Sequence, residues 1–281
     1  MVNRDYLYAG IHYPKEKDIL ANYVNETVSL YKNKKVNCPF CITSPTDDYK
    51  NARKAYGISY SQLIDEKYDT VVVISPIHKI AFDSFVLADF DSYSTPLGVS
   101  FVDREANDIL INFNKEFIDY NNDYHINEYS IELQLPFIQS VLGFDTKILP
   151  IIMGKTNTKF TIMLSKALST LLSKSGNKKI LIIVVMNLSK GLPLTKIIEK
   201  DNKFVEVFSK LNIDHFSEQL SIGTIEAYGA GGLIAVMRMI DNLSIDKIKI
   251  LGLSNSSIFA EDNNKVNGYI SIVVENQSIS N

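Results

Sequence analysis

Short, uninterrupted apolar runs separated by amphipathic segments constrain the fold of this chain more than any other feature. Residues 70–75 read Thr-Val-Val-Val-Ile-Ser, and residues 180–186 read Ile-Leu-Ile-Ile-Val-Val-Met. Runs of this kind are typical of strands buried on both faces, because neither face carries the polar residues that water would require. They are far shorter than the roughly 20 residues that a bilayer span needs. The pattern therefore indicates central strands covered on both sides by helices.

Strands and helices are predicted to alternate along the chain. The predicted strands are 40–44, 70–75, 85–90, 99–102, 147–153, 179–186, 247–253 and 269–274. The predicted helices are 15–31, 50–65, 104–117, 129–142, 159–173, 195–211, 214–221 and 230–241, with an acidic, Asn-rich loop at 119–127. This order predicts an α/β protein, a three-layer αβα sandwich around a mixed, largely parallel central sheet. Without a repeat or a Pro/Gly/Ser-rich linker, residues 1–281 are expected to form a single domain.

Composition and charge exclude several classes of protein. Of the 281 residues, 46% are hydrophobic and 22% are charged, which excludes wholesale disorder. The formal net charge of −3 gives no electrostatic case for binding nucleic acid or an anionic membrane. The first residues lack the apolar core of a secretory signal, so we expect a cytoplasmic protein.

The two cysteines, Cys38 and Cys41, form a C-x-x-C pair that looks like a glutaredoxin motif. A redox thiol of that type needs a strand before it and a helix N-terminus beneath it, and neither is predicted here. A zinc site would need two further ligands, whereas the histidines are scattered singly. We predict reduced, largely buried residues of one strand, because positions i and i+3 of a strand lie roughly 10 Å apart and a disulfide needs less than about 7 Å.

The carboxyl ends of the predicted central strands carry polar residues. These ends read Ser-Pro-Thr at 44–46, Ser-Pro-Ile-His at 75–78 and Met-Asn-Leu at 186–188. In open α/β sheets, sites form at this edge. A site is therefore expected where these three segments end.

Four motifs give the chain its resemblance to a known family. They are Ala-Gly-Ile-His-Tyr-Pro at 9–14, Ser-Pro-Ile-His at 75–78, Thr-Pro-Leu-Gly at 95–98 followed by Asp103, and Glu-Tyr-Ser-Ile-Glu-Leu-Gln-Leu-Pro-Phe at 128–137. In this order and over nearly the whole length, the chain resembles the Memo family. Memo proteins are similar in fold to the catalytic subunit of class III extradiol dioxygenases of the LigB type, so the resemblance also implies an α/β sandwich.

The resemblance implies three metal-ligand positions, of which this chain keeps one. Where the family has a histidine, a second histidine and a cysteine, this chain has Thr46, His78 and Tyr228. Two further family histidines are also absent. Tyr129 occupies the first position, and Lys190, or Ser189 after a one-residue shift, occupies the second. Asn187 stands at a family aspartate.

One histidine does not make a non-haem iron site, which needs about three ligands. Neutral threonine and tyrosine are poor ligands, so we expect no metal or other cofactor. A rearranged triad of Asp47, His78 and Glu226 is the alternative, since Glu226 would face the same side as Tyr228 in an extended segment. The competing interpretation makes Asp47 and Asp48 caps of the helix that follows.

Several residues keep two interpretations at this stage. His78 is either a general base or a residual pocket histidine, and Lys190 either binds an anion or is a solvated loop lysine. Tyr129 and Tyr228 either contact a ligand or fill vacated volume. Glu128 and Glu132, four residues apart in a predicted helix, fit the family block better than an acid/base pair. The glycine-rich segment at 229–232 fits close helix packing better than a phosphate loop.

Together these observations predict a Memo-like protein with a degenerate metal pocket and a non-catalytic binding or scaffold role. Partners would be Memo-type, radical-SAM or Ammecr-type proteins, or a second copy of the chain, with an unknown small-molecule ligand. The alternative is an enzyme, either a dioxygenase-like oxidoreductase with the rearranged triad or a metal-free acid/base pocket. In either case, His78, Tyr129 and Tyr228 are expected to line one cavity with at least one of Thr46, Asp47, Asn187 and Lys190.

Overall fold

The structure is a computed structural model of the chain. It describes residues 1–32, 35–36, 38–79, 82–115, 117–241, 247–260, 262 and 264–275.

Two sheets form within the described residues. The large sheet has eight strands in the order β10-β11-β2-β9-β3-β8-β4-β7, and the small one has the order β1-β5-β6. The strands are β1 (Asn3–Arg4), β2 (Pro39–Ser44), β3 (Thr70–Pro76), β4 (Phe85–Leu87), β5 (Ser92–Thr95), β6 (Gly98–Phe101), β7 (Ile118–Tyr120), β8 (Lys147–Met153), β9 (Ile180–Val185), β10 (Lys247–Asn255) and β11 (Gly268–Glu275). The four central strands β2, β9, β3 and β8 are mutually parallel, whereas β11 and β4 join them antiparallel. The large sheet is therefore mixed but parallel at its centre.

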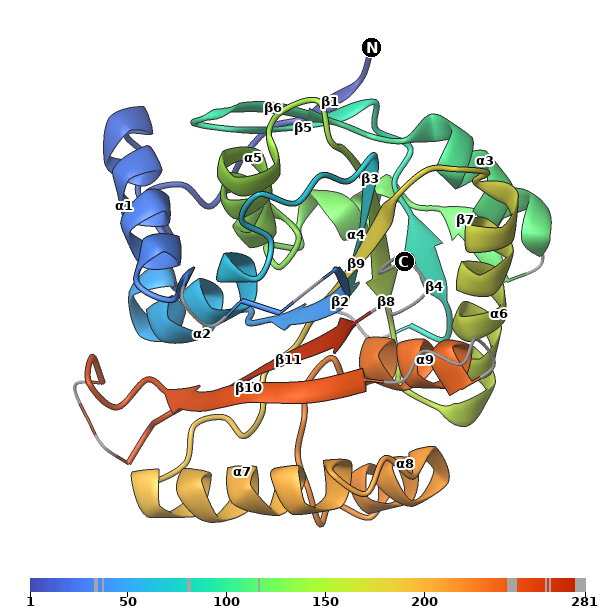
Figure 1. The fold of residues 1–281 in the computed structure, drawn as a ribbon. Helices are drawn as coiled ribbons and strands as arrows, with labels where there is room; N and C mark the ends of the chain where they lie inside the picture. The colour runs from blue at the N-terminus through green and yellow to red at the C-terminus, as the bar shows by residue number, and fades with distance from the viewer. Residues whose placement is uncertain are drawn as a thin grey trace.

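Helices cover both faces of this sheet (Figure 1). They are α1 (Lys17–Ser29), α2 (Tyr49–Ser61), α3 (Arg104–Phe113), α4 (Asn122–Ile126), the 3-10 turn η2 (Glu132–Gln134), α5 (Leu135–Leu142), α6 (Thr158–Lys174), α7 (Leu194–Phe208), α8 (Ile213–Ser221) and α9 (Ala230–Asp241). Among the described residues, no helix is long and apolar enough to span a membrane.

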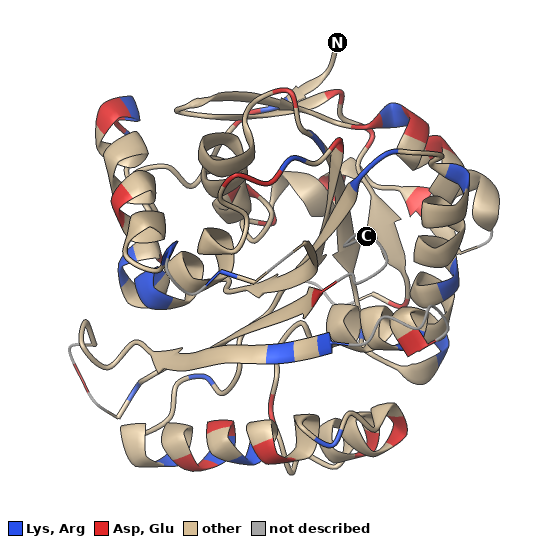
Figure 2. Cartoon of the chain, viewed as in Figure 1, with Lys and Arg blue, Asp and Glu red and all other residues tan. Residues whose placement is uncertain are grey.

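Alternate residues of β3 enter two separate cores, which is the signature of a sandwich with three layers. Val71 and Val73 pack with side chains of α1, α2 and α5. Val72 and Ile74 pack with side chains of α3, α6, α7, α8 and α9. Both faces exclude water, as the uninterrupted apolar run requires. Figure 2 accordingly shows charged residues mainly on the helices and loops, with the central strands nearly free of them.

The predicted fold class and the three diagnostic strands, 70–75, 147–153 and 179–186, are confirmed. The prediction of a loop over 119–127 is wrong, because β7 ends there and α4 follows. Asn121 caps α4 by accepting hydrogen bonds from the backbone N–H groups of Asp123 and Tyr124, a role for which Asn is well suited. Of the small sheet, the sequence predicts only strand β6.

The predicted helix over 129–142 is shorter in the structure. Residues 132–134 form the 3-10 turn, and α5 starts only at Leu135, with Pro136 in its first turn. Proline fits there because the first N–H groups of a helix have no intrahelical partner. Glu128 therefore precedes the helical segment, and the expectation that Glu128 and Glu132 share one helical face is wrong.

The two cysteines have different environments. Both are free thiols; Cys41 is buried within β2, but Cys38 is only partly buried. Cys38 precedes the strand with φ 45°, in the left-handed region. The prediction of two buried strand residues is correct for Cys41 and wrong for Cys38, because the strand begins at Pro39. Burial raises the pKa of the Cys41 thiol.

Candidate functional site

The site lies where β2, β9 and β3 end, and hydrogen bonds join the segments that follow the first two strands. The Thr46 backbone N–H donates to Asn187 Oδ1 at 2.9 Å, and Asn187 Nδ2 donates to the Thr46 carbonyl at 3.0 Å. Asn187 also forms a β-bridge with Tyr228, which leads into α9. These contacts fix Thr46, Asn187 and Tyr228 relative to one another, as expected for parallel strands with adjacent carboxyl ends.

A buried carboxylate holds His78 in place. Glu128 Oε1 lies 2.8 Å from His78 Nδ1, and Glu128 Oε2 accepts the His78 backbone N–H at 2.8 Å. Ser130 donates both its backbone N–H and its hydroxyl to Oε1, at 3.0 and 2.7 Å. Burial by itself raises the pKa of Glu128, but the hydrogen bonds and charge of His78 and the bonds from Ser130 outweigh it, so that the pKa is lowered.

An ionised Glu128 favours the imidazole tautomer with its proton on Nδ1. The other ring nitrogen, Nε2, has no hydrogen-bond partner among the described residues. In the neutral ring, Nε2 is then a proton acceptor on the side away from Glu128.

Five aromatic rings form a continuous row through the site. His78 lies between Tyr129 and Tyr228, with ring centroids 4.4 and 4.7 Å away. Beyond Tyr129 the row continues to His12, 4.8 Å from Tyr129, and to Tyr8, 5.5 Å from His12. Such distances are those of interacting aromatic pairs.

His12 was not among the predicted site residues, although it belongs to the motif at 9–14. Its Nδ1 pairs with Asp48. Asp48 does stand at the N-cap position of α2, but its side chain makes no capping hydrogen bond. The predicted cap is therefore wrong in its chemistry, because the Asp48 carboxylate binds an imidazole instead of the helix.

The hydroxyl groups at the two altered ligand positions are already engaged. The Thr46 hydroxyl lies 2.7 Å from Ser130 Oγ, and the Tyr228 hydroxyl donates to the Ile77 carbonyl. Burial and the nearby Glu128 raise the pKa of Tyr228, so it remains a neutral phenol. A metal ion prefers anionic or imidazole donors. His78 is the one donor of that kind at the three inherited positions, so the residues present do not fit the metal that the resemblance implies.

The structure does not assemble the alternative triad of Asp47, His78 and Glu226. Asp47 Oδ2 accepts hydrogen bonds from Asn267 Nδ2 and the Tyr269 hydroxyl, both at 2.6 Å. Glu226 pairs with Lys200 on the surface. Across the described part of the chain, no group of three His, Cys, Asp or Glu side chains is arranged to hold a metal ion. Both carboxylates are turned toward structural partners instead.

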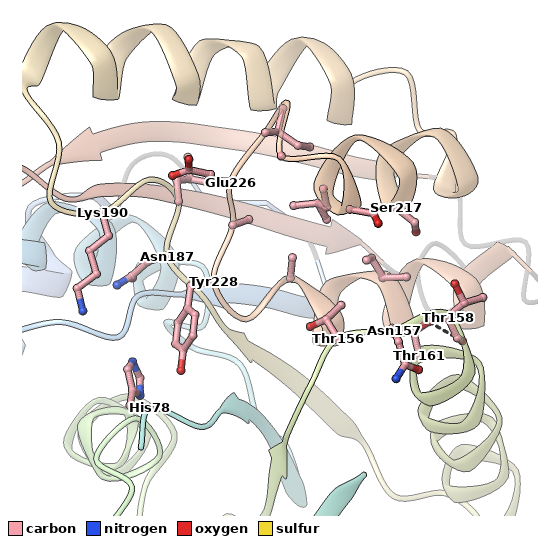
Figure 3. Close-up of a pocket in the computed structure, with 18 residues that line it drawn as sticks. His78, Thr156, Asn157, Thr158, Thr161, Asn187, Lys190, Ser217, Glu226 and Tyr228 are labelled. Carbon is pink, nitrogen blue, oxygen red and sulfur yellow. Dashed lines mark hydrogen bonds between the residues drawn. The ribbon is translucent and has the colours of Figure 1, made fainter. Parts of the chain in front are cut away.

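A cavity of about 740 Å³ opens beside His78. Of the predicted site residues, its wall includes His78, Asn187, Lys190, Glu226 and Tyr228 (Figure 3). Thr46, Asp47 and Tyr129 are not part of this wall. The Tyr129 ring packs against the His78 ring, with the ring centroids 4.4 Å apart. The cavity also extends to α6 and α8, which the sequence did not indicate.

The glycines that open α9 allow close packing. A Cβ atom on Gly232 would lie 2.9 Å from Ile74 of β3, and one on Gly231 would lie 2.7 Å from the Thr156 hydroxyl. Gly229 has φ +87°, a conformation that glycine adopts readily. These contacts favour the packing interpretation of this segment.

Glu132 belongs to a different network. It pairs with the buried Arg4 and accepts hydrogen bonds from the Leu7 and Tyr8 backbone N–H groups and from the Tyr13 hydroxyl. It therefore anchors the N-terminal segment.

Comparison with known proteins gives a consistent result. The sequence profile described as "Memo-like protein" matches residues 4–273. A "MEMO1 family protein" of Methanosarcina barkeri is 32% identical over 209 residues, covering 74% of this chain and 77% of the relative. A "MEMO1 family protein" of Sulfurisphaera tokodaii is 27% identical over 277 residues, covering 94% and 96%.

Proposed function

The chain belongs to the Memo-like protein family, and from this premise we propose that it is a non-catalytic member whose cavity binds a small organic anion without a metal ion. The observation that carries the proposal is the orientation of His78. Glu128 binds Nδ1, the Tyr129 and Tyr228 rings pack beside the imidazole, and Nε2 has no hydrogen-bond partner among the described residues.

Lys190 supplies the positive charge. Its side chain points toward the space that His78, Asn187 and Tyr228 border (Figure 3). Glu226, the other wall residue with a full charge, is paired with Lys200. Within the described ranges, Lys190 has no ion-pair partner of its own. An anionic group would meet this uncompensated ammonium, and a hydroxyl on the ligand would donate to His78 Nε2.

The donors at the inherited positions support a cavity without a metal ion. Thr46 and Tyr228 would each have to give up both a hydrogen bond and a proton to become anionic ligands. The raised pKa of Tyr228 opposes that change at neutral pH. We therefore propose a metal-free cavity in which Lys190 carries the charge that a ligand meets and Glu226 is neutralised by Lys200.

Calorimetric titration with hexanoate tests anion binding, and 1-hexanol serves as the uncharged probe. We expect Lys190→Met to weaken hexanoate binding about tenfold, the size of one partly exposed charge contact. Lys196→Met is the matched control, because Lys196 is exposed on α7 and outside the cavity. Equal effects of the two variants, or equal binding of hexanoate and 1-hexanol, would contradict the proposal.

Metal content is tested separately. Elemental analysis of chelator-free protein, followed by titration with Fe(II), Zn(II) and Cu(II), should detect no tight metal in wild type or in His78→Ala. Uptake of one equivalent at micromolar affinity by wild type alone would overturn the metal-free site. As a positive control, Thr46→His combined with Tyr228→Cys places three metal-binding donors at the inherited positions and should gain affinity.

A metal-free acid/base enzyme is the second candidate, because the Glu128–His78 pair orients Nε2 as a general base would require. Hydrolysis of 4-nitrophenyl acetate provides a simple measurement, with His78→Gln compared with wild type. The surface variant His215→Gln, on α8, is the control for non-specific imidazole catalysis. A loss confined to His78→Gln would favour this candidate over simple binding.

Binding of protein partners remains a prediction from the family resemblance. Memo-type, radical-SAM and Ammecr-type proteins are the expected classes, together with self-association. Light scattering over a range of concentrations measures self-association directly.

A further inference from the structure

The cavity has two chemically different ends. One, the charged pole, consists of His78, Asn187, Lys190 and Tyr228. The other, the hydroxyl pole, consists of six uncharged polar residues: Thr156, Asn157, Thr158, Thr161, Ser217 and Ser221. Figure 3 shows the labelled members of the two poles as separate groups, the hydroxyl pole lying where α6 begins and beside α8. Gly223 and residues 225–228 also line the cavity wall.

Several groups of the hydroxyl pole are not used by the protein. Thr161 donates to the Thr158 carbonyl, and Ser217 donates to the Ile213 carbonyl. In contrast, the hydroxyls of Thr156, Thr158 and Ser221 make no hydrogen bond to any residue that the structure describes. They are free to bind a ligand, and no charged side chain lies among them.

The rest of the wall is apolar. It includes Leu188, Leu220, Ile225, Ala227, Ala230 and Ile234. The volume of about 740 Å³ falls within the range of roughly 300–1,000 Å³ that is usual for sites of drug-sized ligands. An anion that filled only the charged pole would leave most of this space and all of the free hydroxyls to water.

We propose that the ligand is an extended monoanion whose far end carries an uncharged hydroxyl or amide group bound by Thr158 and Ser221 at the hydroxyl pole. This inference rests on the proposed anion-binding function and adds the chemistry of the ligand's other end. A second charge at that end would lose water without gaining an ionic partner, so the hydroxyl pole selects a neutral polar group.

Three probes of equal chain length separate these properties. Each has a carboxylate and nine chain atoms: nonanoate ends in a methyl group, 6-acetamidohexanoate has an amide near its end, and nonanedioate ends in a second carboxylate. Their dissociation constants are measured by calorimetry with wild type, with Thr158→Val combined with Ser221→Ala, and with Lys190→Met. Thr170→Val, on α6 but outside the cavity wall, is the matched control.

The decisive quantity is the preference for 6-acetamidohexanoate over nonanoate in each protein. Two ordinary hydrogen bonds correspond to about a tenfold change in affinity. The preference should therefore be about tenfold smaller in the double variant than in wild type. Thr170→Val should keep it. Lys190→Met should weaken the binding of both probes by a similar factor, because it removes the cation that contacts their shared carboxylate. The ratio of their dissociation constants should stay unchanged. Nonanedioate should bind no better than 6-acetamidohexanoate.

Failure of the two proposals can be told apart. A preference that changes less than twofold in the double variant, or tighter binding of nonanedioate, overturns the inference about the hydroxyl pole. If Lys190→Met leaves the affinity for the probes unchanged, the anion-binding function is overturned, whether or not the preference for 6-acetamidohexanoate over nonanoate changes. If no probe binds wild type at all, both proposals fail.

Discussion

Glu128 and Glu132 come from one sequence block and are both buried, yet they serve two different regions of the molecule. Glu132 is surrounded by donors from the N-terminal segment, which satisfy both of its oxygens. Glu128 is surrounded by Ser130 and His78, and through His78 it reaches the cavity. The N-terminal network is closed, whereas the network of Glu128 ends in His78 Nε2, which has no hydrogen-bond partner among the residues that the structure describes.

The comparison shows how a protein separates stability from a binding site. A closed network of buried polar groups fixes the structure, since every member has a partner. A network that ends at a cavity leaves one group for a ligand. A separation of four residues along the chain is enough to give two carboxylates different roles. Four predictions test this difference.

The largest effect is expected from Glu132→Gln. The change leaves Arg4, which is buried, without its counter-charge, and a broken buried ion pair costs roughly 3–5 kcal/mol of unfolding free energy. Urea unfolding measures the loss. Glu206→Gln, an exposed change on α7, should leave the unfolding midpoint unaltered. A loss no greater than that of Glu206→Gln would contradict the structural role of Glu132.

Asp201→Asn should stabilise the protein, because Asp201 is a buried carboxylate that lacks the closed network of Glu132. The Ser189 N–H donates to it at 3.4 Å, and burial raises its pKa from 3.8 to about 6. The folded state therefore binds this proton more tightly than the unfolded chain. The resulting stability is full below about pH 3.8 and lost as the pH rises through about 6.

At pH 7.5 that loss is complete, so Asp201→Asn should gain about 2–3 kcal/mol in urea unfolding. At pH 4 the gain should nearly vanish, which makes the pH dependence the control. An equal gain at both pH values would show that titration of Asp201 is not the cause.

Glu128→Gln should cost less than Glu132→Gln, about 2 kcal/mol, since the amide keeps some hydrogen bonds and no buried arginine loses its partner. Its more specific effect concerns His78. Nitrogen-15 chemical shifts of the imidazole should show the Nδ1-protonated tautomer in wild type and a mixture in the variant. If the tautomer is unchanged, the Glu128 carboxylate does not orient the ring.

Tyr228→Phe is expected to have the smallest effect. It removes the hydrogen bond to the Ile77 carbonyl but keeps the ring beside His78, at a cost of about 1 kcal/mol. The thermal midpoint should fall by a few degrees, while hexanoate binding stays within about twofold of wild type. A tenfold loss of hexanoate affinity would assign the Tyr228 hydroxyl to the ligand instead of to the wall.

Local sequence pattern determined the fold class. The apolar runs of β3, β8 and β9 place these strands at the centre of the sheet, because only a strand covered on both faces tolerates such runs. The motif at 128–137 and the ends of three strands also pointed to the place where Thr46, His78 and Asn187 meet. Periodicity and burial are properties of short segments, so one sequence is enough to predict them.

Which polar groups contact one another depends on how distant segments of the chain pack. Asp47 binds Tyr269, which lies 222 positions along the chain, and His12 packs beside Tyr129. Neither pairing produces a periodic pattern in the sequence that could predict it. Short elements such as β7 likewise depend on a neighbouring strand for their hydrogen bonds. The hydroxyl pole likewise exists only because α6 and α8 border the same cavity. The partner of a polar side chain is set by how distant segments pack, and that information is not local.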